Sequence, residues 1–200
     1  MDISTMFYIL ESIGIYSFAL SGLILARSRN FDPVGMYIVA LVTAFGGGTL
    51  RDLILDQHPV YWISHNEFPI IILGLTILYY LFTRIQIPPH TLIIPDALGL
   101  ALFTISATQL SLSKNLPLFI VSLMAVMSAT FGGLLRDVMC NDVPLIFKKT
   151  SLYASLTFLG SWLYIFIAPF FEAPLVATTL CVIFIFIARL ISVRFNIRFN

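Results

Sequence analysis

Two short segments of this chain are near copies of each other. Residues 44–52 read Ala44-Phe45-Gly46-Gly47-Gly48-Thr49-Leu50-Arg51-Asp52, and residues 129–137 read Ala129-Thr130-Phe131-Gly132-Gly133-Leu134-Leu135-Arg136-Asp137. Each segment places an Arg-Asp pair shortly after a run of glycines, and the two arginines are 85 positions apart. Such a repeat constrains the whole fold, because each copy is expected to form the same structural unit.

The same shift of 85 positions relates residues well outside these segments. We therefore predict a single transmembrane domain over residues 1–200 that contains two repeats, about residues 7–86 and about residues 92–170. A further helix at about residues 174–191 has no counterpart, and residues 192–200 form a basic tail. The matched pairs include Gly14 with Gly99, Phe18 with Phe103, Ser21 with Ser106, Pro59 with Pro144, Tyr79 with Tyr164, and Glu11 with Asp96.

The composition is that of a membrane protein. Apolar residues make up 59% of the chain and charged residues only 10%, with a net charge of +1 and two cysteines. Soluble domains carry about 25% charged residues, so a soluble enzyme, a disordered chain and a nucleic-acid-binding protein are excluded. Two cysteines are too few for a disulfide framework, and no spacing predicts a metal site. The apolar runs are continuous rather than alternating, which predicts an all-α polytopic protein and not a β-barrel.

Seven apolar runs are long enough, or nearly long enough, to cross a membrane, which takes about 20 residues. The first run follows no basic leader, so we expect it to stay as a span rather than to be cleaved as a signal peptide. The third run is short and leaves room for an extension past Arg84. The predicted spans are Phe7–Ala26, Val34–Leu55, Pro69–Phe82, Leu92–Leu110, Leu116–Met139, Ser151–Ala168 and Pro174–Ile191.

The odd number of spans in each repeat determines how the repeats are oriented. Three spans bring the second repeat into the membrane from the opposite side, and inverted repeats of this kind place binding or permeation sites near the midplane. Lys and Arg favour cytoplasmic loops. Their distribution predicts a multi-pass protein of the inner membrane with its N-terminus outside and its C-terminus in the cytoplasm. Lys114 then lies outside, and eight basic residues lie inside: Arg27, Arg29, Arg84, Lys148, Lys149, Arg189, Arg194 and Arg198.

The glycine clusters are predicted to shape a pathway. Each glycine inside a helix costs about 1 kcal/mol relative to alanine, so Gly46, Gly47 and Gly48 are expected to kink or unwind one helix. Gly132 and Gly133 are expected to do the same to another. Backbone groups freed in this way must be satisfied by protein or water, and we expect them to line a polar pathway. The alternative is that the small residues let two helices pack closely.

Charged residues beside the glycine clusters are the candidate pore or gating charges. A charge inside the bilayer is costly, so Arg51 and Arg136 are expected to face the interior and to find partners there. Neighbouring residues on a helix point about 100° apart, which disfavours pairing within each Arg-Asp dipeptide. Glu11 and Asp96 are the candidate partners on other helices.

A second interpretation of the same charges is purely structural. The Arg-Asp pairs would lie at helix ends and reach the headgroups, while Glu11 and Asp96 would be helix-start carboxylates at the interface, favoured by the helix dipole. We expect Asp52 and Asp96 near the outer ends of their spans and Asp137 near an inner end. Hydroxyls on the same helices that could solvate an ion are those of Ser21, Thr49 and Ser106.

Taken together, these motifs resemble the prokaryotic branch of the trimeric intracellular cation (TRIC) channel family. The resemblance runs from about Phe7 to Ile187, nearly the whole chain. The segments that carry it are Phe18-Ala19-Leu20-Ser21-Gly22, Gly46-Gly47-Gly48-Thr49-Leu50-Arg51-Asp52, Asp96-Ala97-Leu98-Gly99-Leu100-Ala101-Leu102-Phe103, Gly132-Gly133-Leu134-Leu135-Arg136-Asp137-Val138 and Leu152-Tyr153-Ala154.

The resemblance implies a homotrimer of seven-helix subunits. Each subunit would carry its own pore between helices one, two, four and five, with kinks at the glycines of helices two and five. The resemblance also implies conduction of monovalent cations, mainly K⁺ and also Na⁺, without a metal cofactor and with lipid bound between or beside subunits. One residue departs from the family pattern: Phe131 stands where a third glycine is common, which would stiffen its helix or place an apolar plug in the pathway.

The sequence therefore favours a passive cation channel, without enzymatic activity, over three other functions. Inverted repeats with broken helices serve a secondary transporter equally well, and paired Arg and Asp could hold a small zwitterion such as an amino acid. An intramembrane aspartyl hydrolase needs two carboxyls that share one site, and the expected depths of Asp52, Asp96 and Asp137 argue against it. A scaffold without a pathway is the remaining alternative.

Overall fold

The computed structural model describes residues 3–82, 88–148 and 152–197. Over these ranges the regular structure is entirely helical, which confirms the predicted all-α fold. The short 3₁₀ helices are η1 (Pro89–Leu92), η2 (Leu145–Phe147) and η3 (Ala168–Phe170). The α-helices are α1 (Ile3–Ser28), α2 (Pro33–Ile54), α3 (Tyr61–Ser64), α4 (Glu67–Phe82), α5 (Ile93–Ser113), α6 (Leu118–Met139), α7 (Ala154–Ile167) and α8 (Pro174–Arg194).

All the α-helices except α3 lie where spans were predicted. Five of them, α1, α2, α5, α6 and α8, are apolar and long enough to cross a membrane, whereas α4 and α7 have 16 and 14 residues. The predicted end of the first repeat at residue 86 and the predicted start of the sixth span at Ser151 lie outside the described residues. Arg84, Lys149 and Arg198 lie outside them too.

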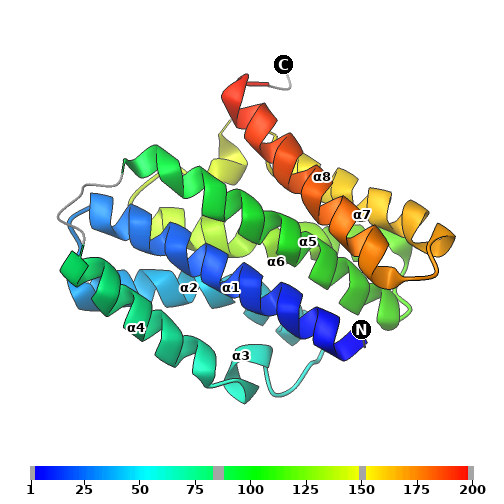
Figure 1. The fold of residues 1–200 in the computed structure, drawn as a ribbon, viewed down its shortest axis with the longest axis horizontal. Coiled ribbons are helices and arrows are strands. Elements are labelled where there is room, and N and C mark those ends of the chain that lie inside the picture. Colours follow the sequence, from blue (N-terminus) through cyan, green and yellow to red (C-terminus); the bar gives the residue numbers. More distant parts are fainter. Residues whose placement is uncertain (1–2, 83–87, 149–151, 198–200) are drawn as a thin grey trace.

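The helices form two inverted three-helix repeats and a seventh long helix. The first repeat contains α1, α2 and α4, and the second contains α5, α6 and α7. α1 packs against α5 and α2 against α6, and Figure 1 shows α1 and α5 running in opposite directions. α8 packs against α5 and α7, so it lies beside the second repeat, while α4 lies on the other side of the central helices (Figure 1).

Matching turns end the matching helices. Asn30 after α1 has φ 58° and Asn115 after α5 has φ 55°, while Asp56 after α2 has φ 52° and Asn141 after α6 has φ 56°. Asn and Asp tolerate this left-handed conformation at helix C-termini better than other non-glycine residues. The members of each pair are 85 positions apart, so the same helix end is built twice.

The glycine motifs lie where α2 crosses α6. Gly47 in α2 faces the backbone carbonyl of Ser128 in α6, and Gly132 in α6 faces the carbonyl of Thr43 in α2. A methyl group at either glycine would overlap the facing oxygen. Both helices are continuous through their glycines, so the predicted unwinding is wrong. The glycines instead allow the backbones of two continuous helices to approach closely.

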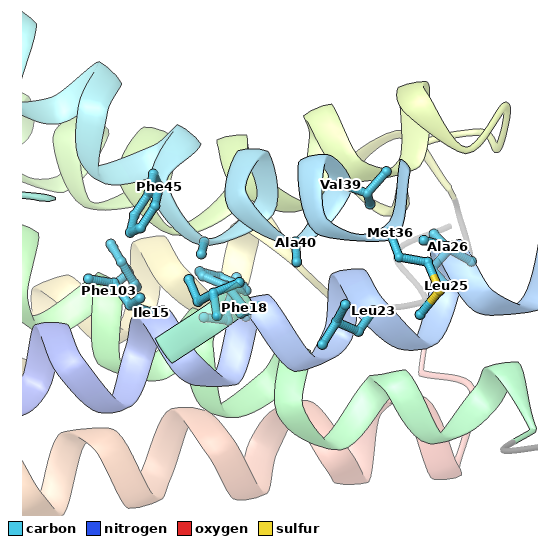
Figure 2. Close-up of a cluster of buried hydrophobic side chains, with 14 of the residues drawn as sticks. Ile15, Phe18, Leu23, Leu25, Ala26, Met36, Val39, Ala40, Phe45 and Phe103 are labelled. Carbon is cyan, nitrogen blue, oxygen red and sulfur yellow. The ribbon is translucent and has the colours of Figure 1, made fainter. Parts of the chain in front are cut away.

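An apolar core fills the space between the central helices (Figure 2). Phe18 of α1 and Phe103 of α5 are buried, with their ring centroids 5.3 Å apart. Each ring lies against a glycine of the opposite helix, Phe103 against Gly14 and Phe18 against Gly99. Figure 2 shows Ile15 and Phe45 near Phe103. Phe18 and Gly14 of the first repeat are equivalent to Phe103 and Gly99 of the second repeat. Each repeat therefore supplies one ring and one glycine to the same kind of apolar contact.

Candidate functional site: two buried arginine–carboxylate clusters

The first cluster lies in the first repeat and is called here the repeat-1 cluster (Glu11, Arg51 and Asp52). Arg51 is 0% exposed. Its Nη1 donates to Glu11 Oε1 of α1 at 2.5 Å, and its Nε donates to Asp52 Oδ1 at 2.8 Å. The guanidinium therefore touches two carboxylates inside the helix bundle, an arrangement that offsets much of the cost of burying its charge.

The second cluster repeats this geometry and is called here the repeat-2 cluster (Asp96, Arg136 and Asp137). Arg136 is also 0% exposed. Its Nη1 donates to Asp96 Oδ1 of α5 at 2.7 Å, and its Nε donates to Asp137 Oδ1 at 2.9 Å. The two clusters thus use the same atoms of equivalent residues.

One serine connects each cluster to the opposite repeat. Ser106 of α5 accepts a hydrogen bond from Arg51 Nη1 at 3.4 Å, and Ser21 of α1 accepts one from Arg136 Nη1 at 2.9 Å. Both serines are 0% exposed. Each arginine is therefore held by a carboxylate of its own repeat and by a hydroxyl of the opposite repeat, and the two halves of the molecule share their buried charges.

A further pair of glycines leaves room for the clusters. A Cβ added at Gly48 would lie 3.8 Å from Arg51 Nη2, and one added at Gly133 would lie 3.8 Å from Arg136 Nη2. At Gly133 the added atom would also come within 2.8 Å of the Tyr153 hydroxyl. The glycines of each motif therefore have two roles. Gly47 and Gly132 allow α2 and α6 to come into close contact, and Gly48 and Gly133 leave space beside the arginines.

The second oxygen of each Asp in the Arg-Asp dipeptides is bound by the loop that follows. The backbone N–H of Tyr61, at the start of α3, donates to Asp52 Oδ2 at 2.9 Å. The N–H of Leu145, at the start of η2, donates to Asp137 Oδ2 at 2.9 Å. Burial, together with the nearby charge of Glu11, raises the pKa of the Tyr61 phenol, so this side chain is neutral where it covers the repeat-1 cluster.

The apolar core lies between the two clusters. On α1, Phe18 lies between Glu11 and Ser21, whose partners belong to different clusters, and on α5 Phe103 is placed in the same way. The cavity beside Arg51, which Glu11, Gly48 and Phe103 help to line, measures about 10 Å³. A cavity of that size holds about one water molecule. The buried rings of Phe18 and Phe103 therefore fill the region between the two clusters.

The structure shows which side chains are the partners of Arg51 and Arg136. Glu11 and Asp96 are the partners of the two arginines, as expected. The prediction that neighbours do not pair is wrong, because each arginine side chain is long enough to turn back onto the next residue of its own helix. Both arginines are fully buried, so the alternative in which they reach the headgroups is also wrong.

The positions of two acids differ from expectation. Asp96 does not lie at the end of the molecule that holds Asp52, because it shares Arg136 with Asp137. Consecutive spans run in opposite directions, so α5 starts at the end of the molecule where α6 finishes, and Asp96 meets Arg136 there. Glu11 is not a helix-start carboxylate, since α1 begins at Ile3 and Glu11 is 1% exposed.

Three predicted site residues lie away from the clusters. Gly46, Thr49 and Phe131 line an apolar cavity of about 380 Å³ beside α2 and α6. Thr49 accepts a hydrogen bond from Trp62 Nε1 at 3.0 Å, so its hydroxyl is not directed at the charges. Phe131 is not a plug between the clusters.

Two residues that surround the repeat-2 cluster are not predicted as site residues from the sequence. Tyr153 is 3% exposed and its hydroxyl donates to Asp96 Oδ1 at 3.5 Å. Arg189 was counted with the inside segments, but it is 1% exposed within α8, so it is not a loop residue. The signal that could have found it is a charged residue inside the last apolar run, which is costly in a membrane.

A solved structure shares this arrangement of helices. The chain superposes with a TM-score of 0.89 on the trimeric intracellular cation (TRIC) channel orthologue from Rhodobacter sphaeroides, at 27% identity over 96% of this chain and 100% of that one. A family model described as "Glycine transporter" matches residues 8–84 and 93–169, one segment in each repeat. The chain belongs to the family that this model defines, and the solved structure identifies it as the TRIC family.

Relatives of this TRIC protein include bacterial membrane proteins. It is 36% identical to the UPF0126 membrane protein YvgT of Bacillus subtilis over 156 residues, 76% of each chain. It is 29% identical to the UPF0126 inner membrane protein YadS of Escherichia coli K12 over 194 residues, 96% of this chain and 93% of the relative. The similarity to YadS therefore covers both repeats and most of α8.

Proposed function

We propose that this protein is a passive channel for monovalent cations, K⁺ first and also Na⁺, with one pathway in each subunit of a homotrimer. The observation that carries the proposal is the pair of equivalent buried clusters at opposite ends of the subunit. Similarity to a TRIC channel orthologue supports it. The pathway would run between α1, α2, α5 and α6, from one cluster to the other.

The charges of the clusters suit cations. Each holds one arginine and two carboxylates of its own repeat, a formal charge of −1. Carboxylates at a pore favour cations, whereas an unpaired arginine would repel them. Here both arginines are bound by carboxylates, which reduces that repulsion.

Conduction requires the apolar contact between the clusters to open. Phe18 and Phe103 fill that region, and apolar constrictions close pores by excluding water. Glycines 14 and 99 lie against the two rings, and movement of α1 relative to α5 would separate them. We expect this contact to be the closed gate.

A flux assay tests the proposal. Purified protein is reconstituted in liposomes loaded with potassium salt, and K⁺ efflux is followed with and without valinomycin, in the presence of a protonophore that lets H⁺ carry the compensating charge. We expect efflux from protein-containing liposomes without valinomycin, with flux that rises in proportion to the K⁺ gradient. Liposomes that release K⁺ only after valinomycin is added would contradict a cation channel.

A second candidate function is a secondary transporter for a small zwitterion such as an amino acid. The description of the matching family model, "Glycine transporter", favours it. The geometry beside the charges argues against it, because the cavity there measures about 10 Å³ and Arg51 already binds two carboxylates. Glycine uptake that saturates and depends on an ion gradient would favour the transporter, whereas K⁺ flux without saturation favours the channel.

A surface cavity offers a binding site for lipid. The apolar cavity of about 380 Å³, lined by Leu41, Leu53 and Phe131 among others, is open at the surface and suits an acyl chain. We propose that lipid binds there and that the protein needs no metal or other cofactor.

We also propose an inner-membrane location with the N-terminus outside and the C-terminus in the cytoplasm, as the basic residues predict.

A further inference from the structure

Both clusters hold an arginine between two carboxylates, but α8 adds a charged residue beside the repeat-2 cluster. α8 belongs to neither repeat and packs against α5 and α7, and it reaches the surroundings of the repeat-2 cluster through Tyr153. α8 carries Arg189, which is 1% exposed. The seventh helix therefore adds a buried positive charge to one end of a molecule that is otherwise built symmetrically.

Arg189 is held in place without an acidic partner of its own. Its Nη1 donates to the backbone carbonyl of Leu152 at 3.0 Å, and its guanidinium lies 4.7 Å from the centroid of the Tyr153 ring. In the part of the chain that the structure describes, no carboxylate lies within 4.0 Å of it and its Nε has no hydrogen-bond partner. Its charge is therefore not neutralised by direct contact.

The nearest charges that Arg189 can act on belong to the repeat-2 cluster. Tyr153 separates them, with its ring against Arg189 and its hydroxyl 3.5 Å from Asp96 Oδ1. Asp96 and Arg136 both lie within electrostatic range of Arg189. In the first repeat the position of Tyr153 is taken by Phe68, whose ring packs against Tyr16 and Tyr61.

We propose that Arg189 cancels the excess negative charge at the repeat-2 end of the pathway and makes conduction asymmetric. The repeat-1 cluster keeps a formal charge of −1, while the repeat-2 cluster together with Arg189 has a formal charge of 0. A negative mouth raises the local cation concentration, so cations enter more readily from the repeat-1 end. This inference rests on the proposed channel function.

The proposal is tested by comparing single-channel currents at positive and negative voltages of equal size. In symmetric KCl of about 0.1 M, where the screening length is about 10 Å, the wild-type currents at equal and opposite voltages should differ about twofold. Arg189→Gln should bring this ratio close to one by raising the smaller current. Arg189→Lys keeps the charge and changes the hydrogen-bonding geometry, so it should keep the wild-type ratio.

Two further variants separate charge from structure. Glu11→Gln removes the excess charge of the repeat-1 end, so it should also bring the ratio towards one, but by lowering the larger current. Asp96→Asn combined with Arg189→Gln returns the repeat-2 end to a formal charge of 0 and should restore the wild-type asymmetry. A merely structural role of Arg189 predicts the same loss for Gln and Lys and no restoration by the double variant.

The outcomes distinguish this inference from the proposed function. Asymmetry that falls in salt of about 1 M, where screening shortens to about 3 Å, supports the charge mechanism. Wild-type currents that are symmetric at low salt, or an unchanged ratio in Arg189→Gln, would overturn the role of Arg189 and leave the channel intact. Absence of any cation current from the wild type would overturn the channel itself and this inference with it.

Discussion

The arginines of the two clusters depend on the charged groups around them. Arg51 and Arg136 are completely buried, and each binds two carboxylates and a serine of the opposite repeat. A buried ion pair contributes little net stability, but removal of one partner leaves an uncompensated charge. These side chains are therefore difficult to replace for structural reasons alone, whatever they do to ions.

Removal of Arg136 should destabilise the protein strongly. Arg136→Ala leaves Asp96 and Asp137 buried without their cation, and breaking a buried pair in this way costs about 3–5 kcal/mol. We expect a clearly lower unfolding temperature in detergent. Arg29→Ala is the control, because Arg29 and its partner Asp142 are 44% and 28% exposed. Equal loss of stability in the two variants would contradict the account of the repeat-2 cluster.

The aromatic contact between the clusters gives a second prediction at this scale. Phe103→Ala removes a ring that packs against Phe18 and Gly14, so it should widen the closed passage and raise the open probability. Phe184→Ala is the control, because Phe184 on α8 is 46% exposed. Planar-bilayer recordings measure both. Unchanged gating in Phe103→Ala would show that the closed gate lies elsewhere.

At the scale of single residues, sequence reasoning found the charges but not their full environment. Glu11 and Asp96 were identified because the repeat shift pairs them and because buried arginines need acidic partners. Tyr153 and Arg189 are not predicted, because the first repeat has Phe68 at the position of Tyr153 and α8, which carries Arg189, has no repeat counterpart. The pairing of Arg51 with Asp52 was judged from the helical angle between their Cα–Cβ directions, which ignores the reach of a long side chain.

The crossing of α2 and α6 is the element-scale feature that the glycine motifs produce. Gly47 and Gly132 allow each backbone to approach the carbonyl of the other helix. The sequence favours kinked or unwound helices over close packing at these glycines, whereas the structure shows close packing at Gly47 and Gly132. The choice depends on which helix lies opposite, and this is known only from the tertiary structure.

A glycine substitution at this crossing should be far more disruptive than one elsewhere. Gly132→Ala places a methyl group on the Thr43 carbonyl oxygen, and overpacking of this kind typically costs about 1–3 kcal/mol. Gly74→Ala is the matched control, because an added Cβ on α4 meets nothing within 4 Å and alanine favours the helix by about 1 kcal/mol. Unfolding temperatures in detergent compare the two. Similar values for both variants would be evidence against close packing at the crossing.

The whole molecule combines a symmetric part with an asymmetric addition. Two inverted repeats build equivalent clusters, equivalent helix ends and a shared aromatic contact, and α8 packs mainly against α5 and α7 of the second repeat. The seven apolar runs and the repeats could be read from the sequence because both depend on composition and spacing. α3 could not, since its four residues carry no periodic pattern.

The orientation of this assembly in the membrane follows from its basic residues. Burial of Arg189 removes it from the loops, and the remaining loop charges still favour a cytoplasmic C-terminus. A green fluorescent protein fused to the C-terminus should therefore fluoresce in intact cells, whereas alkaline phosphatase at the same position should be inactive. Active phosphatase at the C-terminus would reverse the predicted topology.

The reversal potential of the purified protein in a planar bilayer under a KCl gradient tests the central claim most directly. A pathway between clusters that carry excess carboxylates should select K⁺ over Cl⁻, so the current should reverse close to the K⁺ equilibrium potential. Reversal near the Cl⁻ equilibrium potential, or no current at any voltage, would contradict the account.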